Sequence, residues 1–439
     1  MKMETTFEVV NPHSAGVDMG AGDIFVSTDG KAVKIYETFT SDYHQCIAYL
    51  KEQKIERVAM EATGVYWIAF YELLEQNGFE VCLVNPKETK QVKGRKSDVS
   101  DCQWIQKLFA AGLLRQSYIP SGRLKELRML MREREDIIDM GSAYVNKMQK
   151  ALELMNIKLT NVISQIHGVS GIKMIEAILA GERDAEVLLE LCDKRIIKNK
   201  SDEIKKALEG NYNPSWLFLL AQNLKMWKIH ETQVLCIDKK IDEVLKDLNR
   251  GRDKIKHSGK EKPIRHHKPE IEDLQQKLVN LYGTDVSSIS GLTNYSLLKL
   301  VGETGIDLKQ FPTAKHFVSW CQLSPRNSKS GKMNRKVRTK NKSKAGQIFR
   351  EAAQSLMQSK NIAIGAFMRK VRSKKGGIVA VKAGARKIAV AYFNMITKGI
   401  EYVEEGVRNY EARIKQRELK LLTLLANKHQ LKLVDYQAV

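Results

Sequence analysis

Two long runs of apolar residues, spaced alternately three and four positions apart, constrain the fold of this chain more than any other feature. The first run covers positions 124–155 and the second covers positions 217–248, and in each run eight of the ten spaced positions are apolar. The four exceptions are Arg134, Gly141, Glu231 and Asp238. This spacing predicts long helices that pair, either as an antiparallel hairpin within the chain or as a coiled coil between chains. A helical bundle packed on itself has the same pattern.

The region before these runs alternates between strand-like and helix-like segments. Runs rich in β-branched and apolar residues predict strands at residues 7–10, 16–19, 23–27, 31–36, 57–60 and 80–84. Longer segments predict helices at residues 41–53 and 66–77. Strands that alternate with crossover helices indicate a mixed α/β sheet.

The length of the chain implies several domains. A chain of 439 residues is too long for one compact core. We predict an α/β domain at residues 1–120, a long-helix, coiled-coil region for assembly at 121–272, a mostly helical domain at 273–410 and a helical tail at 411–439.

The charge of the chain indicates a polyanionic partner. The sequence carries 73 Lys and Arg against 51 Asp and Glu, a net charge of +22, and nucleic acid is the commonest large polyanion. No apolar run approaches the roughly 18 residues that a membrane span requires, and the N-terminus lacks the apolar core of a signal peptide. The six cysteines form no CxxC pair, which argues against a disulfide framework and a zinc site. We therefore expect a cytoplasmic protein without a membrane partner.

Four acidic residues stand where strand ends and a helix can bring them together. Asp18 and Glu61 each follow an apolar run, so both lie at the end of a predicted strand. Asp98 and Asp101 are three residues apart at the start of a predicted helix, which places them on one helix face. Acids at the ends of adjacent strands, facing a helix with two more, fit the two-metal site of an RNase H-like domain.

Each of these acids also has a purely structural explanation. An aspartate beside a glycine at a strand end is commonly a turn residue, and Asp98 can cap its helix. The order of the four acids, two at strand ends and two on a helix, favours the metal site. Carboxylate ligands select hard cations, so the expected cofactor is Mg²⁺ or Mn²⁺ rather than zinc.

The most basic segment of the chain contains a second candidate site. Residues 325–387 include 19 Lys and Arg and a single acid, Glu351. Within this segment Ser330 precedes Gly331 in a predicted basic loop, where a serine hydroxyl can attack a phosphodiester while guanidinium groups stabilise the developing charge. From the residues alone, a serine that only donates a hydrogen bond to a phosphate is the simpler interpretation.

Basic residues around both candidate sites are expected to contact nucleic-acid phosphates. The predicted contact residues are Lys96, Lys332, Arg335, Arg338, Lys340, Arg350 and Arg386. Aromatic residues are sparse in the basic segment, so stacking on single-stranded bases is not the expected binding mode.

Several stretches of the chain resemble the DEDD-type transposases of the insertion-sequence one-ten family, in the same order and over nearly the whole length. In the N-terminal part they are GVDMG at 16–20, MEATG at 60–64, NPK at 85–87 and KSDVSD at 96–101. In the C-terminal half they are ISG at 289–291, LSP at 323–325, SGK at 330–332, REAA at 350–353 and ARKIA at 385–389.

This resemblance implies a specific mechanism. It implies a RuvC-like N-terminal domain whose four acids, Asp18, Glu61, Asp98 and Asp101, bind Mg²⁺. It implies that Ser330 is a nucleophile that links covalently to DNA, and that the two sites combine across subunits of a homo-oligomer built from dimers. It also implies a structured non-coding guide RNA, the bridge RNA, which pairs with double-stranded donor and target DNA. The chain is thus expected to be a DNA transposase or recombinase.

Two positions depart from the pattern of that family. The family often has glycine where this chain has Gln322, and many members have two glycines after the serine where this chain has one. The second difference leaves Ser328 as another candidate nucleophile.

Two other functions stay open at this point. A RuvC-like, metal-dependent, structure-specific nuclease would cut with activated water and form no covalent intermediate. A non-catalytic nucleic-acid-binding protein would use the basic segment alone.

Overall fold

The computed structural model divides the chain into two compact units, residues 1–119 and residues 120–439. The residues it describes are 8–89, 98–256, 261–325, 327–330, 333–336, 343–402, 404 and 406–432. At 87, 88, 98, 327–330 and 333–336 it describes the backbone alone.

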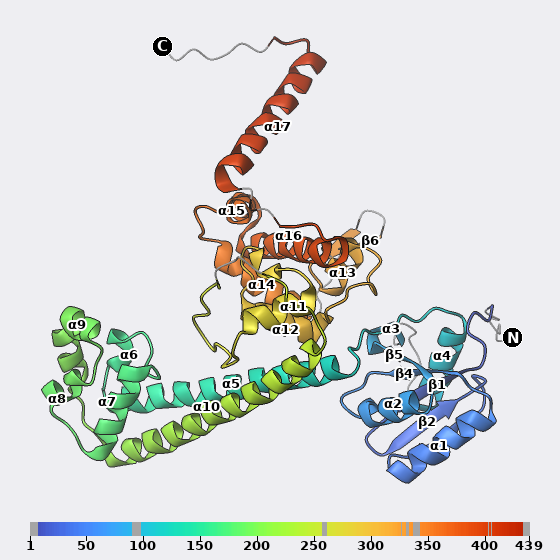
Figure 1. The fold of residues 1–439 in the computed structure, drawn as a ribbon, viewed down its shortest axis with the longest axis horizontal. Coiled ribbons are helices and arrows are strands. Elements are labelled where there is room, and N and C mark those ends of the chain that lie inside the picture. The colour runs from blue at the N-terminus through green and yellow to red at the C-terminus, as the bar shows by residue number, and fades with distance from the viewer. Residues whose placement is uncertain are drawn as a thin grey trace. The chain divides into compact units, whose positions relative to one another are not determined.

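The first unit contains a five-stranded mixed sheet (Figure 1). The strands are β1 (Ser14–Met19), β2 (Asp23–Ser27), β3 (Lys34–Glu37), β4 (Arg57–Glu61) and β5 (Glu80–Val84). They lie in the order β3-β2-β1-β4-β5, and β2 is antiparallel to both β1 and β3, while β1, β4 and β5 are parallel. The mixed α/β sheet predicted from the sequence is therefore confirmed, and its strand order is consistent with an RNase H-like fold.

Helices of the first unit bury the two faces of this sheet separately. They are α1 (Thr40–Glu52), α2 (Trp67–Gln76), α3 (Pro86–Thr89) and α4 (Asp98–Ala110). Val17 and Met60 belong to the core that α1 and α2 complete, whereas Ala59 belongs to a smaller core with Ile105 and Phe109 of α4. Since successive side chains of a strand point to opposite faces, this alternation fixes which strand residues face α4.

The strand predicted at residues 7–10 is wrong for the part of it that the structure describes. Residues 8–10 form no strand, and the backbone N–H of Val10 instead donates to the carbonyl of Ala110, at 2.7 Å. This carbonyl lies at the end of α4, where the last turn of a helix leaves carbonyl oxygens without partners in the helix. The apolar side chains of Val9 and Val10 stay exposed.

In the second unit, the two long helices pair within the chain as an antiparallel hairpin (Figure 1). They are α5 (Arg123–Leu154) and α10 (Pro214–Asn249). Arg123 near the start of α5 bonds to Asp247 near the end of α10, and the rings of Tyr144 and His230 lie 5.1 Å apart further along.

Two of the four exceptions to the apolar spacing, Arg134 and Asp238, meet across the hairpin. The guanidinium of Arg134 donates to both carboxylate oxygens of Asp238, at 2.5 and 3.1 Å, and both side chains are 1% exposed. Gly141 faces His230 and Trp227 on the other helix. The buried ion pair and the small residue thus both lie in the interface between α5 and α10.

The hairpin joins two cores at its opposite ends. Four short helices complete one core with Met148 and Leu152 of α5 and Leu220 of α10. They are α6 (Leu159–Val162), α7 (Val169–Ala180), α8 (Ala185–Glu190) and α9 (Lys194–Ala207). The other core includes Leu127 of α5 and Ile241 of α10.

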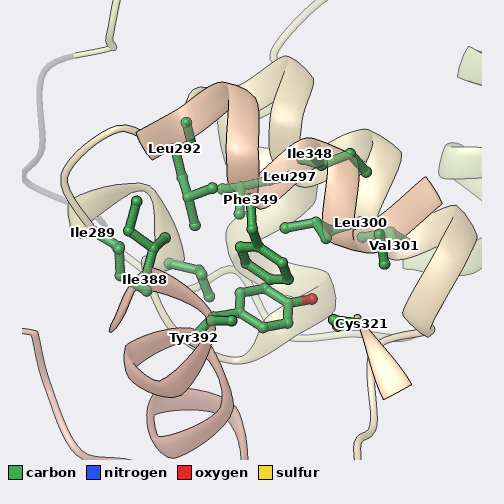
Figure 2. Close-up of a cluster of buried hydrophobic side chains, with 14 of the residues drawn as sticks. Ile289, Leu292, Leu297, Leu300, Val301, Cys321, Ile348, Phe349, Ile388 and Tyr392 are labelled. Atoms are coloured by element: carbon green, nitrogen blue, oxygen red, sulfur yellow. The ribbon is translucent and has the colours of Figure 1, made fainter. Parts of the chain in front are cut away.

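This second core is built mainly from the C-terminal helices. They are α11 (Leu274–Tyr282), the 3-10 turn η1 (Val286–Ser288), α12 (Asn294–Thr304), α13 (Ala314–Trp320), α14 (Lys344–Leu356), α15 (Ala363–Lys375) and α16 (Gly377–Lys398). Figure 2 shows Tyr392 and Phe349 at its centre, and the Tyr392 hydroxyl bonds to that of Tyr282 at 2.9 Å. Gly291 belongs to this packing, because a Cβ there would lie 2.7 Å from the carbonyl oxygen of Ala352.

Two further elements complete the described part of the chain. Strands β6 (Asn327–Ser330) and β7 (Met333–Lys336) form an antiparallel pair, and α17 (Gly406–Lys428) follows α16. None of the helices in the described residues combines the length and the hydropathy that a membrane span requires. All six cysteines are free.

The backbone conformation of Gln322 leads to a prediction about stability. Its φ is 57°, a left-handed conformation that favours glycine, the residue that the family resembled by this sequence often has there. We expect Gln322→Gly to raise the free energy of unfolding by about 0.5–1 kcal/mol, measured by denaturant titration. Gln310→Gly, outside the residues with positive φ, is the control and should not stabilise. Equal effects of both changes would contradict this explanation.

Candidate functional site

Asp18 and Glu61 lie side by side at one edge of the sheet. Strands β1 and β4 are parallel, with Val17 opposite Met60, so the next step of the register places Asp18 beside Glu61. Side chains two residues apart on a strand point to the same face of the sheet. Asp18 therefore lies on the same face as Gly16, and Glu61 lies on the same face as Ala59. Gly16 and Ala59 both pack against α4, so the two acids lie on the face of the sheet that α4 covers.

The direction of α4 brings its first turn to the same edge. A Cβ on Gly16 would overlap the carbonyl oxygen of Cys102 and the backbone nitrogen of Gln106, so helix and strand touch directly there. Gln106 donates to the carbonyl of Ser14, at the start of β1. Since the helix runs antiparallel to β1, its beginning lies toward the carboxyl end of the strand, where Asp18 stands.

The helix contributes the other two predicted acids. Asp98 is the first residue of α4 and Asp101 follows one turn later, as the spacing predicted. Burial first, and then the negative charges of Asp18 and Asp101, raise the pKa of the Cys102 thiol to about 12. The carboxylates of Asp18 and Asp101 therefore both act on the Cys102 thiol, from β1 and from α4.

Glu61 is held by two threonine hydroxyls. Its carboxylate is buried, with the residue 6% exposed, and accepts hydrogen bonds from Thr63 at 3.0 Å and from Thr89 at 2.6 Å. Thr89 lies on the short helix α3, after β5, and it could not be predicted, because a threonine 28 positions from Glu61 has no local signal in the sequence. These hydroxyls fix the orientation of Glu61 at the sheet edge.

The chemistry of this acidic site suits a hard divalent cation, since all its donors are carboxylate oxygens. Among the described side chains, however, no group of three or more His, Cys, Asp or Glu lies close enough to hold a metal ion. The side chain of Asp98 is outside that set. A metal-binding role of Asp18, Glu61, Asp98 and Asp101 therefore stays a prediction.

Ser330 lies at the end of a strand and not in a loop, which corrects the interpretation from sequence. It is the last residue of β6 and pairs with Met333 of β7, while Ser328 pairs with Arg335. Lysine, arginine and serine have no strong strand signal, and backbone pairing between the two strands creates the element. Ser328 and Ser330 are two positions apart on the same strand, so this backbone geometry does not separate the two candidates.

The structure describes the side chains of only some of the predicted phosphate-contacting residues. Arg335 is on β7, where only the backbone is described. Lys96, Lys332, Arg338 and Lys340 lie outside the described residues. Arg350 on α14 and Arg386 on α16 are both half-buried, and each lines a pocket of the second unit.

The environment of Arg350 suits an anion. Arg350, Arg372 and Gln354 line a pocket of about 700 Å³, and none of the described residues that line it is acidic. Arg350 donates from Nε and Nη2 to the neutral amide oxygen of Gln347, at 3.1 and 3.0 Å. Burial lowers the pKa of Arg350, although the nearby charge of Glu351 opposes this effect. A phosphate would compensate the charge of this half-buried guanidinium.

Two family models match the chain on the parts that carry these sites. A model described as "Transposase", of the DEDD type, matches residues 15–157, which include all four acids. A model described as "Transposase IS116/IS110/IS902 family" matches residues 284–369, which include Ser330 and Arg350. No curated protein is similar enough to count as a match.

The two family matches define the class of the protein as a transposase, which acts on DNA. The chain belongs to the IS110 family of transposases, as the resemblance in its sequence indicated. DEDD-type transposases generally use a divalent metal ion.

Proposed function

We propose that this transposase cuts and rejoins DNA with a serine nucleophile and a Mg²⁺-binding acidic tetrad, guided by a bridge RNA. The observation that carries the proposal is the placement of Asp18 and Glu61 at adjacent strand ends, on the face covered by α4. The first turn of α4 supplies Asp98 and Asp101 at the same edge. This arrangement supports an RNase H-like, RuvC-like metal site.

The acids of the first unit would bind and orient the DNA phosphate through the metal. A bound divalent cation stabilises charge on phosphate oxygens during strand transfer. Thr63 and Thr89 hold the carboxylate of Glu61, so this ligand is oriented before metal or DNA arrives. Mg²⁺ is the preferred ion, with Mn²⁺ as a substitute, because all four donors are carboxylates.

In the second unit Ser330 would attack the DNA. Its oxygen forms a bond to phosphorus, the phosphorus–oxygen bond to the leaving sugar breaks, and the proton of the serine hydroxyl passes to solvent or to the leaving oxygen. Guanidinium groups such as that of Arg350 would stabilise the added charge. We further propose that the two sites combine across subunits of a homo-oligomer, and that the guide RNA selects donor and target DNA.

Recombination in cells tests this function directly. Donor and target plasmids are supplied with the wild-type protein and the non-coding RNA that flanks the element, and junctions are counted by sequencing. We expect Ser330→Ala and Asp101→Ala to reduce recombination at least a hundredfold, because each removes a group that acts at the reacting phosphate. Ser328→Ala and the exposed Glu52→Ala are the matched controls and should recombine normally.

Each variant decides a different part of the proposal. Recombination by Ser330→Ala would exclude this serine as the nucleophile, and its loss in Ser328→Ala would assign the role to Ser328. A covalent protein–DNA adduct that forms in the wild type and disappears in Ser330→Ala excludes a nuclease that uses activated water. Strand exchange that survives Asp18→Ala and Glu61→Ala would leave only a non-catalytic binding role.

A further inference from the structure

A second pocket of the C-terminal unit has no role in the function proposed above. It has a volume of about 750 Å³ and is formed by α15, α16, the segment after α16 and the first turns of α17. Its size lies in the range of pockets that enclose a small organic group. The elements that form it lie together in the upper part of Figure 1.

Aromatic and aliphatic side chains form much of the wall of this pocket. Phe367 comes from α15, Tyr402 from the segment after α16, and Tyr410 from α17. Ala383, Val390 and Ala391 line it from α16. Of these three rings only Phe367 belongs to the basic segment 325–387, and the fold adds Tyr402 and Tyr410 from the chain beyond it. The expectation that stacking is not the binding mode was made for the basic segment alone.

Three cationic side chains line the same pocket. Arg386 and Lys387 come from α16 and Arg413 from α17. The Lys387 ammonium lies 4.5 Å from the centre of the Phe367 ring, so positive charge and aromatic surface adjoin. Arg386 is half-buried and Arg413 is exposed, which places cationic groups both within the pocket and at its solvent side.

Glu404, the half-buried acid of the pocket, is held by hydrogen bonds from the protein itself. Glu404 accepts hydrogen bonds from the Ser290 hydroxyl at 2.8 Å, the Tyr402 hydroxyl at 2.6 Å and the backbone N–H of Ala363 at 2.8 Å. Burial raises the pKa of Glu404, but these donors outweigh it and lower the pKa overall. Its carboxylate ties together the elements around the pocket, while Glu401 is exposed and screened by water.

We propose that this pocket binds one unpaired nucleobase, with Arg386, Lys387 and Arg413 contacting the phosphates that flank it. Aromatic and apolar walls suit the faces of a base, and adjacent cations suit the sugar–phosphate chain on either side. A base inside a duplex is stacked and paired and cannot enter, so the ligand is a single-stranded or extruded nucleotide. The inference rests on the proposed nucleic-acid function and adds a specific binding mode to it.

Binding of short oligonucleotides to the full chain tests this inference. Fluorescence anisotropy is measured with a labelled twelve-nucleotide oligothymidylate and with the same backbone lacking its bases, and then with oligouridylate of equal length. Wild-type protein is expected to bind the base-bearing strands about tenfold more tightly than the abasic strand, because stacking adds to phosphate contacts. The comparison of thymidylate with uridylate shows whether DNA or RNA supplies the base.

Substitutions in the pocket show whether the pocket causes the preference for base-bearing strands. Ala383→Leu fills the cavity without removing a core side chain and should abolish the preference for bases, while the exposed Ala412→Leu on α17 should keep it. Arg386→Gln should weaken binding of every strand about threefold, whereas Lys398→Gln removes a charge from an exposed position of the same helix and should have less effect. Thermal unfolding of each variant verifies that it is folded.

Two outcomes would overturn the inference. Equal affinity of the wild type for base-bearing and abasic strands would exclude a base pocket, and so would a preference that survives Ala383→Leu. Absence of binding to every strand would overturn the proposed function as well. A preference for bases that depends on the pocket, in a protein that fails to recombine plasmids, would support this site and contradict the recombinase proposal alone.

Discussion

Asp238→Leu is expected to lower the free energy of unfolding of the C-terminal unit by about 3–5 kcal/mol, because it leaves a buried guanidinium without its counter-ion. Arg134 is 0% exposed, and its two bonds to Asp238 are the only ones it makes to a carboxylate among the described residues. Its other hydrogen bonds among the described residues go to the Tyr295 hydroxyl at 2.9 Å and the carbonyl of His267 at 3.2 Å, which are neutral. They cannot neutralise the charge.

The double variant Arg134→Met/Asp238→Leu shows how much of this loss of stability comes from the unpaired charge. With both charges replaced by apolar groups of similar size, stability should return to within about 1 kcal/mol of the wild type or exceed it. Denaturant titration measures the free energy of unfolding. Hydrogen exchange in peptides of α5 and α10 then shows whether the change in stability occurs in these two helices. Lys240→Ala, which removes an exposed pair with Glu243 on the same helix, is the control and should change stability by less than about 1 kcal/mol.

The double variant also distinguishes the unpaired charge from a lost backbone contact as the cause of the destabilisation. Asp238 accepts from the backbone N–H of Glu270 at 3.0 Å, so the pair also anchors the segment that leads into the C-terminal core. If the single and double variants lose equal stability, the unpaired charge is not the cause, and loss of this backbone contact explains the effect.

Gly16→Ala is expected to disturb the acidic site although it changes no acid. A Cβ at this position would overlap backbone atoms of Cys102 and Gln106, and backbone cannot rotate away as a side chain can. The helix must shift on the sheet, which should cost about 1–3 kcal/mol of stability. Because α4 carries Asp98 and Asp101, the shift also displaces two of the four acids, and recombination should fall about a hundredfold.

Gly22→Ala is the matched control for this prediction. Gly22 lies between β1 and β2, and a Cβ there meets no atom within 4 Å. Thermal unfolding and plasmid recombination of both variants give the two readouts. Full recombination by Gly16→Ala would show that the position of α4 on β1 is not required for function, and would count against the acidic site itself.

The sequence by itself determined most of the local structure of this protein. Strand β2 and strand β5 have the predicted bounds, and both long helices begin and end within three residues of the predicted runs. It also placed Asp18 and Glu61 at strand ends and put Asp98 and Asp101 one turn apart on a helix. These features follow from short-range periodicity, which depends on neighbouring residues only.

Only the tertiary structure decided which distant residues meet. The sequence marked Arg134 and Asp238 as separate breaks in two apolar patterns, and the fold makes them one buried ion pair. It likewise recruits Thr89 to hold Glu61, pairs the strand of Ser330 with a second strand, and gathers Phe367, Tyr402 and Tyr410 around one pocket. The physical reason is that register and packing between elements depend on the shapes of both partners, and that neither partner carries this information in its own local sequence.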